Sequence, residues 1–461
     1  MTSQGSKNSK LFISAPRKSS GKTTLTLGIS AALIQNNHTV KVFKKGADYI
    51  DPMWHRAATG QNCYNLDMHL MSEADCLKSF NKRSYNIDFS LIEGNHGLHD
   101  GIGIKGENSS AHLAKLLAAP VLLVVDAAGA NRGVAAVVLG HQHLDPNVKI
   151  AGVVLNQVAN NRQIRKQRES IEYHCGIPVV GAMPKSTAFK IKERHLGLLT
   201  VHETDMVDEV IKAAAASVSQ NCNLDQIKQL AASSIIPLDS GLKENIKKEK
   251  VVDIAVAYDK AFCFYYPENI EALEAAGANL KFFDTMNDKD LPEADGIYIG
   301  GGFPESFLKE LEENVSMRQQ IRSQIEAGKP TYAECGGLMY LTRSIKYDNV
   351  SAQMVGAVPA DVQFYKKPVG HGYSHLKTIN DSWLNVDYEI RGHEFHYSEL
   401  INLSKNVNFA YQLNRGCGVD KKNDGISLNN LIAAYTHLHA ISVPEWASQF
   451  VDFIKKQKQL S

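Results

Sequence analysis

The chain of 461 residues has few of the features that mark secreted or membrane-bound proteins. Its seven cysteines are odd in number, scattered and never spaced as Cys-x-x-Cys, which argues against a disulfide framework and a structural zinc site. No apolar run approaches the roughly 20 residues that span a bilayer. The segment from Met1 to Lys10 is too polar for a secretory signal, so a reducing cytoplasm fits best.

An excess of charge of either sign is also missing. Lys and Arg number 50 against 49 Asp and Glu, so the formal net charge at pH 7 is +1. Nothing in this balance favours nucleic acid or an anionic membrane as the main partner. The length allows about two to four compact domains, and the sequence contains no internal repeat. The function must therefore lie in motifs of the separate domains.

The N-terminal half alternates short apolar runs with stretches of helical pattern. Helices are predicted at Thr23–Gln35 and Ser109–Leu117, and an amphipathic helix at Thr204–Ser219 closes the unit. Strands that alternate with helices form a parallel sheet with helices on both faces. The predicted buried strands are Leu11–Ala15, Val40–Phe43, Phe89–Glu93, Pro120–Asp126, Ile150–Asn156 and Pro178–Met183.

A change in the sequence pattern near residue 245, from alternating strands and helices to a charged segment, predicts a domain boundary. Residues 236–250 contain a proline and a glycine and end in a charged run, which is typical of a solvated linker. A new strand pattern begins at Val251–Tyr258 and continues through Gly296–Gly300 and Thr331–Glu334. We therefore expect an α/β protein with one domain over residues 9–235 and a second over residues 251–461.

A phosphate-binding loop is predicted between the first strand and its helix. The run Ser20-Gly21-Lys22-Thr23-Thr24 closes a segment in which Pro16 replaces the first glycine of the usual motif. Backbone N–H groups and the helix N-terminus of such a loop bind phosphate oxygens. Lys22 would bridge the outer phosphates of a nucleotide, and the Thr23 hydroxyl would bind Mg²⁺.

Acidic residues follow two strands at the edge where an open α/β sheet binds ligands. Asp48 lies in the segment Lys45–Pro52, and Glu93 ends an apolar strand directly before a glycine. Mg²⁺ takes a few hard oxygen ligands and keeps several of its waters. We therefore predict a Mg²⁺ site made by Thr23, Asp48 and Glu93.

The second half carries a cysteine between a strand and two glycines. Cys335 follows Thr331–Glu334, and Gly336 with the glycine after it allows the tight turn that exposes a nucleophile. The N-terminus of the following helix should lower the pKa of the thiol. Backbone N–H groups of Gly301 and Gly302, at another strand end, offer an oxyanion hole. Together with Gly336 they are the predicted oxyanion pocket.

A cysteine nucleophile also needs a base. The candidates are His437 in the segment Tyr435–His439, and His393 or His396 in the segment Arg391–Tyr397. The chemistry of the residues alone leaves all three histidines open.

Together these motifs resemble the cobyrinic acid a,c-diamide synthase family, glutamine-dependent enzymes of corrinoid biosynthesis. The similarity covers nearly the whole chain, and the order and spacing of the segments make it specific. The matching segments are Ser20–Thr24, Gly46–Pro52, Asn65–Asp67, Glu93–Gly101, Glu193–Leu198, Ala261–Tyr266, Gly300–Glu305, Glu334–Gly337, Gly392–Ser398 and Tyr435–His439.

The resemblance implies an N-terminal domain similar to dethiobiotin synthetase and a C-terminal class I-like glutamine amidotransferase domain. It assigns the nucleophile to Cys335 and the activating histidine to His437. Many class I amidotransferases carry a glutamate two residues after this histidine, where this chain has His439. In this respect the chain is similar to relatives that have a Cys–His pair and no acid two residues after the histidine.

The same resemblance places Asp48, Asp51, Glu93 and Asp100 around an ATP–Mg²⁺ and substrate site. It implies ATP-dependent amidation of the a- and c-acetate carboxylates of a tetrapyrrole through an acyl phosphate. The implied partners are the tetrapyrrole, glutamine and ATP, and a homodimer is compatible with the family.

At some positions this chain departs from the family pattern, and its residues there are more similar to those of a side branch. Ala47, Asn95-His96 and Lys44-Lys45 are closer to sirohaem amidases, while a third branch amidates Ni-sirohydrochlorin. Two further hypotheses are a non-catalytic ATP-switch protein and a stand-alone glutaminase with a degenerate first domain. The first of these leaves the cysteine turn unexplained.

Overall fold

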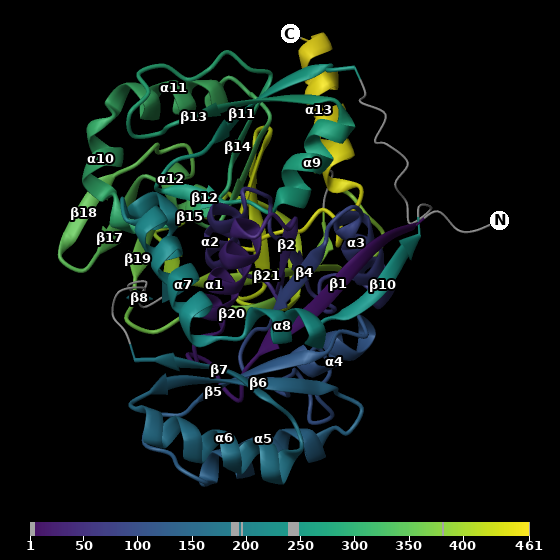
Figure 1. Cartoon of the computed structure of the whole chain (residues 1–461). Helices are drawn as coiled ribbons and strands as arrows, with labels where there is room; N and C mark the ends of the chain where they lie inside the picture. Colours follow the sequence, from purple (N-terminus) through teal and green to yellow (C-terminus); the bar gives the residue numbers. More distant parts are fainter. Residues whose placement is uncertain (1–4, 186–192, 195–196, 238–248, 380–381, 461) are drawn as a thin grey trace. The chain divides into compact units, whose positions relative to one another are not determined.

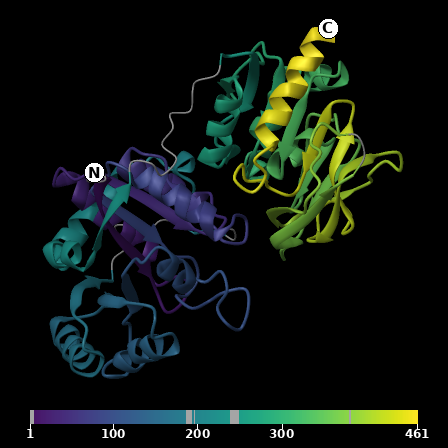
Figure 2. The ribbon, with the colours of Figure 1, turned by 90° about the vertical axis from the view of Figure 1, so that its right-hand side faces the viewer.

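The computed structural model describes residues 5–185, 193–194, 197–237, 249–379 and 382–460. The chain divides into two compact units, Met1–Lys243 and Glu244–Ser461 (Figures 1 and 2). The predicted linker, residues 236–250, lies mostly outside the described residues, as does part of the segment Glu193–Leu198.

The first unit is built on an eight-stranded sheet with the order β3-β2-β4-β1-β5-β6-β7, in which β10 pairs with β1. All six predicted strands are confirmed, and β3 and β10 are additional. The strands are β1 (Gly5–Ser14), β2 (Val40–Lys45), β3 (Tyr64–Leu66), β4 (Phe89–Glu93), β5 (Val121–Asp126), β6 (Ile150–Val158), β7 (Val179–Pro184) and β10 (Ala232–Pro237), with a hairpin of β8 (Glu193–Arg194) and β9 (Gly197–Leu198).

β10 is antiparallel to β1, whereas the other seven strands of this sheet are parallel. The length of β1 explains why β10 can pair with it. Its pairing with β5 begins only at Phe12, opposite Val121, so the first half of β1 has an open edge. β10 pairs with this half, from Gly5 to Lys10.

Helices cover both faces of this sheet, as the alternation of strands and helices predicts (Figure 1). Neighbouring strand residues point to opposite faces. Phe12 therefore packs with α3 to α6, and Ile13 packs with α1, α7 and α8. The helices are α1 (Lys22–Gln35), α2 (Ile50–Thr59), α3 (Glu73–Ser84), α4 (Ser110–Leu116), α5 (Gly133–Leu144), α6 (Asn161–Cys175), α7 (Val207–Asn221) and α8 (Leu224–Leu230).

The second unit has a nine-stranded sheet with the order β13-β11-β14-β16-β25-β24-β23-β20-β21 and a small sheet β18-β17-β19-β22. The first five strands of the large sheet are parallel and the others antiparallel. The strands are β11 (Val252–Ala257), β12 (Phe262–Phe264), β13 (Ala278–Phe283), β14 (Gly296–Ile299), β15 (Gly301–Gly302), β16 (Thr331–Glu334), β17 (Ser344–Tyr347), β18 (Val350–Gln353), β19 (Asp361–Phe364), β20 (Gly370–Thr378), β21 (Ile390–His396), β22 (Ser398–Ile401), β23 (Asn408–Arg415), β24 (Asn423–Leu428) and β25 (Leu431–Ala434).

Helices also cover both faces of the large sheet. Leu311 and Ile321, from α10 and α11, lie in one apolar core with α12, whereas Trp446 and Phe450 of α13 lie in the other with α9. The helices are α9 (Pro267–Ala276), α10 (Leu308–Glu313), α11 (Val315–Glu326), α12 (Gly336–Leu341) and α13 (Trp446–Leu460).

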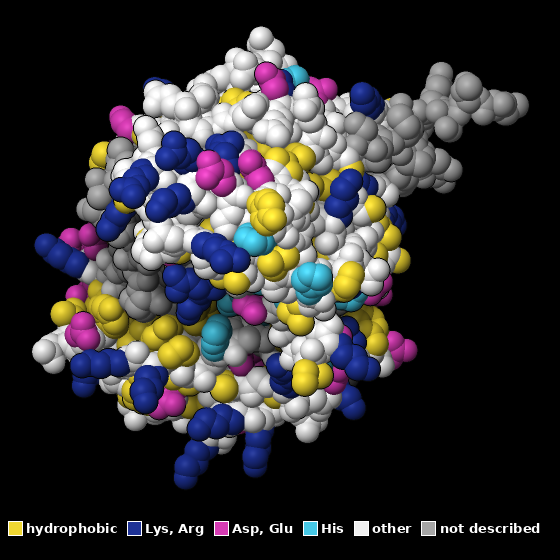
Figure 3. All heavy atoms as spheres, turned by 60° about the horizontal axis from the view of Figure 1, so that its bottom comes forward, with side chains coloured by type: hydrophobic (Ala, Val, Ile, Leu, Met, Phe, Trp, Pro, Cys, Tyr) yellow, Lys and Arg dark blue, Asp and Glu magenta, His cyan; other side chains and the backbone are white. Residues whose placement is uncertain are grey.

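The surface agrees with the balanced composition. Figure 3 shows Lys and Arg side chains interspersed with Asp and Glu on the face that it presents. Within the described residues, no helix is both long and apolar enough to cross a bilayer.

Candidate active sites

The phosphate loop lies where the sequence predicts it, between the end of β1 and the start of α1. Gly21 adopts φ 96°, in the left-handed region that favours glycine. An added Cβ there would lie 2.2 Å from Nδ2 of Asn156, which donates to the Ser20 carbonyl at 2.8 Å. Both the backbone conformation and this close approach therefore require glycine at the turn into α1.

Lys22 begins α1, and backbone carbonyl groups hold its ammonium. Nζ donates to the carbonyl of His96 at 2.7 Å and lies 3.4 Å from that of Arg17. Burial and the charge of Lys44 lower the pKa of Lys22 to about 8. A phosphate at this loop would replace weak carbonyl acceptors by a charged one, which favours the protonated lysine.

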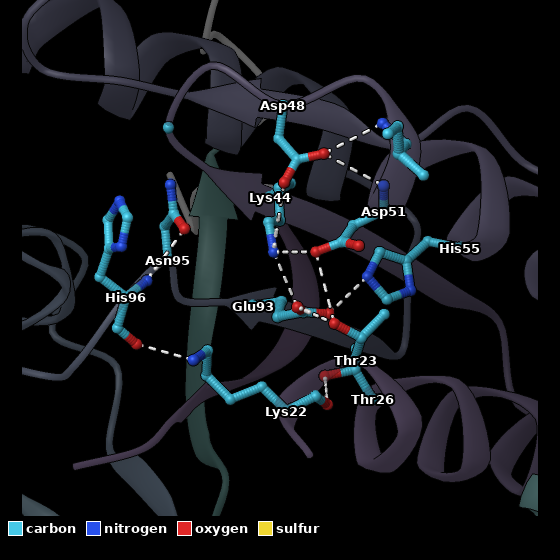
Figure 4. A network of polar contacts seen from close by, with 12 residues as sticks. Lys22, Thr23, Thr26, Lys44, Asp48, Asp51, His55, Glu93, Asn95 and His96 are labelled. Carbon is cyan, nitrogen blue, oxygen red and sulfur yellow. Dashed lines mark hydrogen bonds and ion pairs between the residues drawn. The ribbon is translucent and has the colours of Figure 1, made fainter. Parts of the chain in front are cut away.

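A cluster of three carboxylates surrounds one buried lysine in front of the loop (Figure 4). Lys44 Nζ lies 2.7 Å from Glu93 Oε1 and 3.7 Å from Asp48 Oδ2, and it also pairs with Asp51. The arrangement follows from the sheet, because Lys44 and Glu93 are in register at the carboxyl ends of the parallel strands β2 and β4. Asp51 comes from the first turn of α2.

Both oxygens of the Glu93 carboxylate are engaged. The Thr23 hydroxyl donates to Oε1 at 2.8 Å, and it lies 3.3 Å from Oδ2 of Asp51. Nε2 of His55 lies 2.6 Å from Oε2 of Glu93, and both of these side chains are fully buried. Strand β2, helix α2 and the start of α1 thus fix the orientation of Glu93.

The charged groups of this cluster shift one another's pKa values. Burial raises the pKa of Glu93, but Lys44 and His55 outweigh it and hold that pKa below its usual value. Burial, with the charge of Asp48, raises the pKa of Asp51 to about 7. Burial lowers the pKa of Lys44, but its three carboxylates raise it well above the ordinary value. The charges of Asp48 and Glu93 both raise the pKa of Asp51, and a further cation beside these carboxylates would offset that repulsion.

The predicted Mg²⁺ residues lie together in this cluster. Asp48 and Glu93 both contact Lys44, and Glu93 contacts Thr23. Among the described residues, no group of three or more His, Cys, Asp or Glu is arranged to hold a metal ion by itself. Mg²⁺ at a nucleotide site needs only one or two carboxylates, with phosphate and water as its other ligands. The residues present fit such a site.

Two other predicted residues lie beside the phosphate loop. Asp100 accepts the Gly97 N–H at 2.8 Å, so its carboxylate stabilises the loop after β4. Thr24 lies half-buried in the first turn of α1.

Cys335 forms a sharp turn between β16 and α12. Its φ of 45° and ψ of −99° are unusual for a residue with a side chain, and such strain is typical of functional turns. The thiol is 4% exposed. Burial and the charge of Glu305 raise its pKa, outweighing a hydrogen bond from Gly336. The N–H of Gly336 at the start of α12 lowers the pKa of this thiol as expected, but burial outweighs it, so the expected net lowering is wrong for the free protein.

The predicted glycines lie against this turn. An added Cβ at Gly336 would be 2.9 Å from the nitrogen of Gly302, and one at Gly301 would be 2.4 Å from Cε1 of His437. The two segments that offer N–H groups, and the histidine, thus converge on the turn at Cys335. Only residues without a Cβ allow this approach.

His437 follows β25, the strand next to β16. The buried carboxylate of Asp424 accepts the N–H groups of Tyr435 and Thr436 at 3.0 and 2.9 Å, which fixes the segment that leads to His437. Nδ1 of His437 lies 3.3 Å from Oε2 of Glu334. These contacts, with the close approach of Gly301 to its ring, hold His437 beside the glycine turn at Cys335.

The other two histidines make different contacts. Nδ1 of His393 lies 3.3 Å from the hydroxyl of Tyr266, and its ring stacks on that of His437 at 4.9 Å. Burial lowers the pKa of His393 well below its usual value. Nδ1 of His396 lies 2.7 Å from the carbonyl of Ser398. These contacts suit residues that shape the domain.

Comparisons with known proteins agree with the division of the chain. Residues 11–199 match a family described as the CobQ/CobB/MinD/ParA nucleotide binding domain. Residues 253–444 match the CobB/CobQ-like glutamine amidotransferase domain. A nucleotide-binding domain and an amidotransferase domain in one chain define a glutamine-dependent ligase.

Full-length relatives identify the family. The chain is 42% identical to the cobyrinate a,c-diamide synthase of Magnetococcus marinus, over 98% of each protein. It is 40% identical to that of Caldanaerobacter subterraneus, over 96% of this chain and 97% of the relative. For Methanosarcina barkeri the identity is 38%, over 96% and 95%. The chain belongs to the cobyrinate a,c-diamide synthase family. These relatives give no support to the sirohaem interpretation.

Sequence reasoning missed the roles of four residues in these sites. Glu334 ends the buried strand β16, and Lys44 is one of three lysines in the buried strand β2, and a buried charge signals a charged partner. His55 lies four residues after Asp51, hence on the same side of α2. For Asn156, which contacts the phosphate loop, no local signal exists beyond its place at the end of an apolar run.

Proposed function

We propose that this protein catalyses the ATP-dependent amidation of the a- and c-acetate carboxylates of cobyrinate, with glutamine as the nitrogen source. The observation that carries the proposal is the presence of two complete sets of reactive groups in one chain. One set is the phosphate loop with the Lys44 cluster, and the other is Cys335 with His437. The names of the full-length relatives support cobyrinate as the tetrapyrrole.

The first site activates the carboxylate. A carboxylate resists attack by ammonia, so transfer of the γ-phosphoryl group of ATP to it creates an acyl phosphate with a good leaving group. Lys22 binds the transferring phosphoryl group, and Lys44 places a second positive charge beside it. Thr23, Asp48 and Glu93 would hold Mg²⁺, which supplies charge neutralisation at the phosphates. His55 keeps the Glu93 carboxylate turned toward Thr23.

The second site releases ammonia from glutamine. The thiol proton of Cys335 passes to His437 as the sulfur attacks the carboxamide carbon. N–H groups of Gly301, Gly302 and Gly336 bind the negative oxygen that develops. The proton on His437 then leaves with the amide nitrogen as ammonia, and water hydrolyses the thioester to glutamate. Free ammonia attacks the acyl phosphate, releases phosphate and forms the amide.

Mass spectrometry of the products tests this function. The protein is incubated with ATP, Mg²⁺ and glutamine, and with cobyrinate, sirohaem or Ni-sirohydrochlorin in parallel. We expect the diamide of cobyrinate, through a monoamide, because two carboxylates are modified in turn. Omission of ATP should prevent both products. Amidation of another ring in preference to cobyrinate would overturn the proposed substrate.

Alkylation of Cys335 tests the assignment of the base. Loss of His437 removes the proton acceptor, so His437→Ala should lower glutamine hydrolysis by roughly 10²–10⁴-fold. It should also slow the reaction of Cys335 with iodoacetamide at neutral pH. His393→Ala is the matched control, because its ring stacks on His437. We expect this variant to keep the wild-type alkylation rate, and the opposite pattern would assign the base to His393.

A further inference from the structure

The position that carries a glutamate in many class I triads is His439 in this chain. In the structure this histidine has contacts of its own. Its Nδ1 accepts the Ile441 N–H at 3.1 Å, and its Nε2 lies 3.7 Å from Oε2 of Glu268. An imidazole that takes a proton from a nucleophile is stabilised by an acid partner. A carboxylate from elsewhere in the chain is therefore needed at His437.

Glu334, the residue directly before the cysteine, brings such a carboxylate to His437. Its Oε2 lies 3.3 Å from Nδ1 of His437, and the exposed fractions of the two side chains are 1% and 3%. Parallel pairing explains the contact. Glu334 is opposite Ala434 in the neighbouring strands β16 and β25, so the segment after β25 passes the end of β16.

The other hydrogen bonds to the Glu334 carboxylate come from neutral donors. Oε1 of Glu334 accepts the Tyr332 hydroxyl at 2.8 Å and the Leu438 N–H at 3.1 Å. The Tyr298 hydroxyl lies 3.4 Å from Oε2. Of these four partners, only the imidazole of His437 can become positively charged. The buried carboxylate therefore gains a counter-charge when His437 is protonated, which is the state that follows thiol deprotonation.

We propose that Glu334 is the acid partner of His437, so that the acid and the nucleophile of this centre are adjacent in sequence. The proposal rests on the roles proposed above for Cys335 and His437. Glu334 accepts the Nδ1 proton, which leaves Nε2 as the acceptor of the thiol proton. An added Cβ at Gly301 would lie 3.3 Å from this Nε2, so that nitrogen lies on the side of the glycine turn. Glu334 acts as a positioning residue, because it contacts His437 and not the thiol.

Glu334→Gln tests the proposal with almost no change of shape. The amide oxygen can still accept from Tyr332 and Leu438, so the NH₂ group points at His437. Nδ1 must then accept, and the ring proton moves to Nε2, where it blocks uptake of the thiol proton. We expect kcat for glutamine-dependent amidation to fall by roughly 10²–10⁴-fold, with little change in KM for glutamine. Ammonia-dependent amidation should stay close to wild type.

Tyr332→Phe is the matched control. It removes one hydrogen bond from the same carboxylate but leaves its charge and its contact with His437. We expect glutamine-dependent kcat to remain within a few-fold of wild type. A loss as large as that of Glu334→Gln would mean that the carboxylate is only a structural support, which would overturn the proposal.

Nuclear magnetic resonance of the wild-type protein reports the tautomer of His437 directly, without a change to Glu334. With ¹⁵N-histidine labelling, the signals of His437 are assigned by their loss in His437→Gln. We expect the neutral ring to carry its proton on Nδ1, and an Nε2–H tautomer would overturn the proposal.

Three variants separate the role of Glu334, which rests on the proposed function, from the assignment of the glutaminase centre itself. If Cys335→Ser and His437→Ala retain glutamine-dependent amidation, the assignment of the glutaminase centre itself is wrong. If both lose it while Glu334→Gln keeps wild-type kcat, the centre is correct and only the role of Glu334 is wrong.

Discussion

Cys335→Ser should abolish amidation with glutamine and leave amidation with ammonia intact. The serine hydroxyl is a far weaker nucleophile than a thiolate, and removal of the nucleophile from a catalytic unit costs on the order of 10⁴-fold or more in kcat. The phosphate loop and the Lys44 cluster lie in the other unit of the chain, so their chemistry does not need the cysteine. Product formation is measured at saturating ATP with either glutamine or ammonium salts.

Cys417→Ser is the control for this substitution. Cys417 belongs to the same unit, and its sulfur donates to the carbonyl of Val369 at 3.1 Å, a contact that a hydroxyl can keep. This variant should retain both activities. Loss of ammonia-dependent amidation in a folded Cys335→Ser protein would contradict the division of labour between the two units.

Lys22→Ala should stop amidation from either nitrogen source. Lys22 is the buried lysine of the phosphate loop, and its Nζ donates to the backbone carbonyls of His96 and Arg17, which are weak acceptors. Removal of one group that stabilises a charged transition state lowers kcat by about 10²–10³-fold. The measurement is kcat with ammonia, where the cysteine plays no part.

Lys18→Ala provides the comparison within the same loop. Lys18 is exposed, so its removal should change kcat by less than a few-fold. In both lysine variants the alkylation rate of Cys335 should equal that of wild type, since the second unit is unchanged. Turnover near wild type in Lys22→Ala, with ammonia, would refute the assignment of the phosphate loop.

Long apolar strands and the order of motifs made most of this fold predictable. Phe89–Glu93 is buried along its whole length, so its hydrophobic run could be recognised without knowledge of its neighbours. β10 is different, because its pairing depends on the open edge left by the long strand β1. β3 is only three residues long, too short for a periodic pattern.

The nucleophile, the phosphate loop and Glu93 lie in local motifs, which is why the sequence indicates them. The partners of these residues depend on strand register, which a single sequence does not reveal. Lys44 lies beside Glu93 because β2 and β4 pair with these two residues opposite each other. Glu334 reaches His437 for the same kind of reason, although 103 positions separate them. The pKa of Cys335 was mispredicted because burial is a property of the folded chain.

The burial of Cys335 also bears on how the protein withstands oxidants. Peroxides attack the thiolate and reach it only where the sulfur is exposed. The resting sulfur is covered and protonated, since its side chain is 4% exposed and its pKa is raised. Conversion to sulfenic acid is thereby confined to the part of the catalytic cycle in which the proton has left. The burial of this proposed nucleophile should therefore also slow its oxidation.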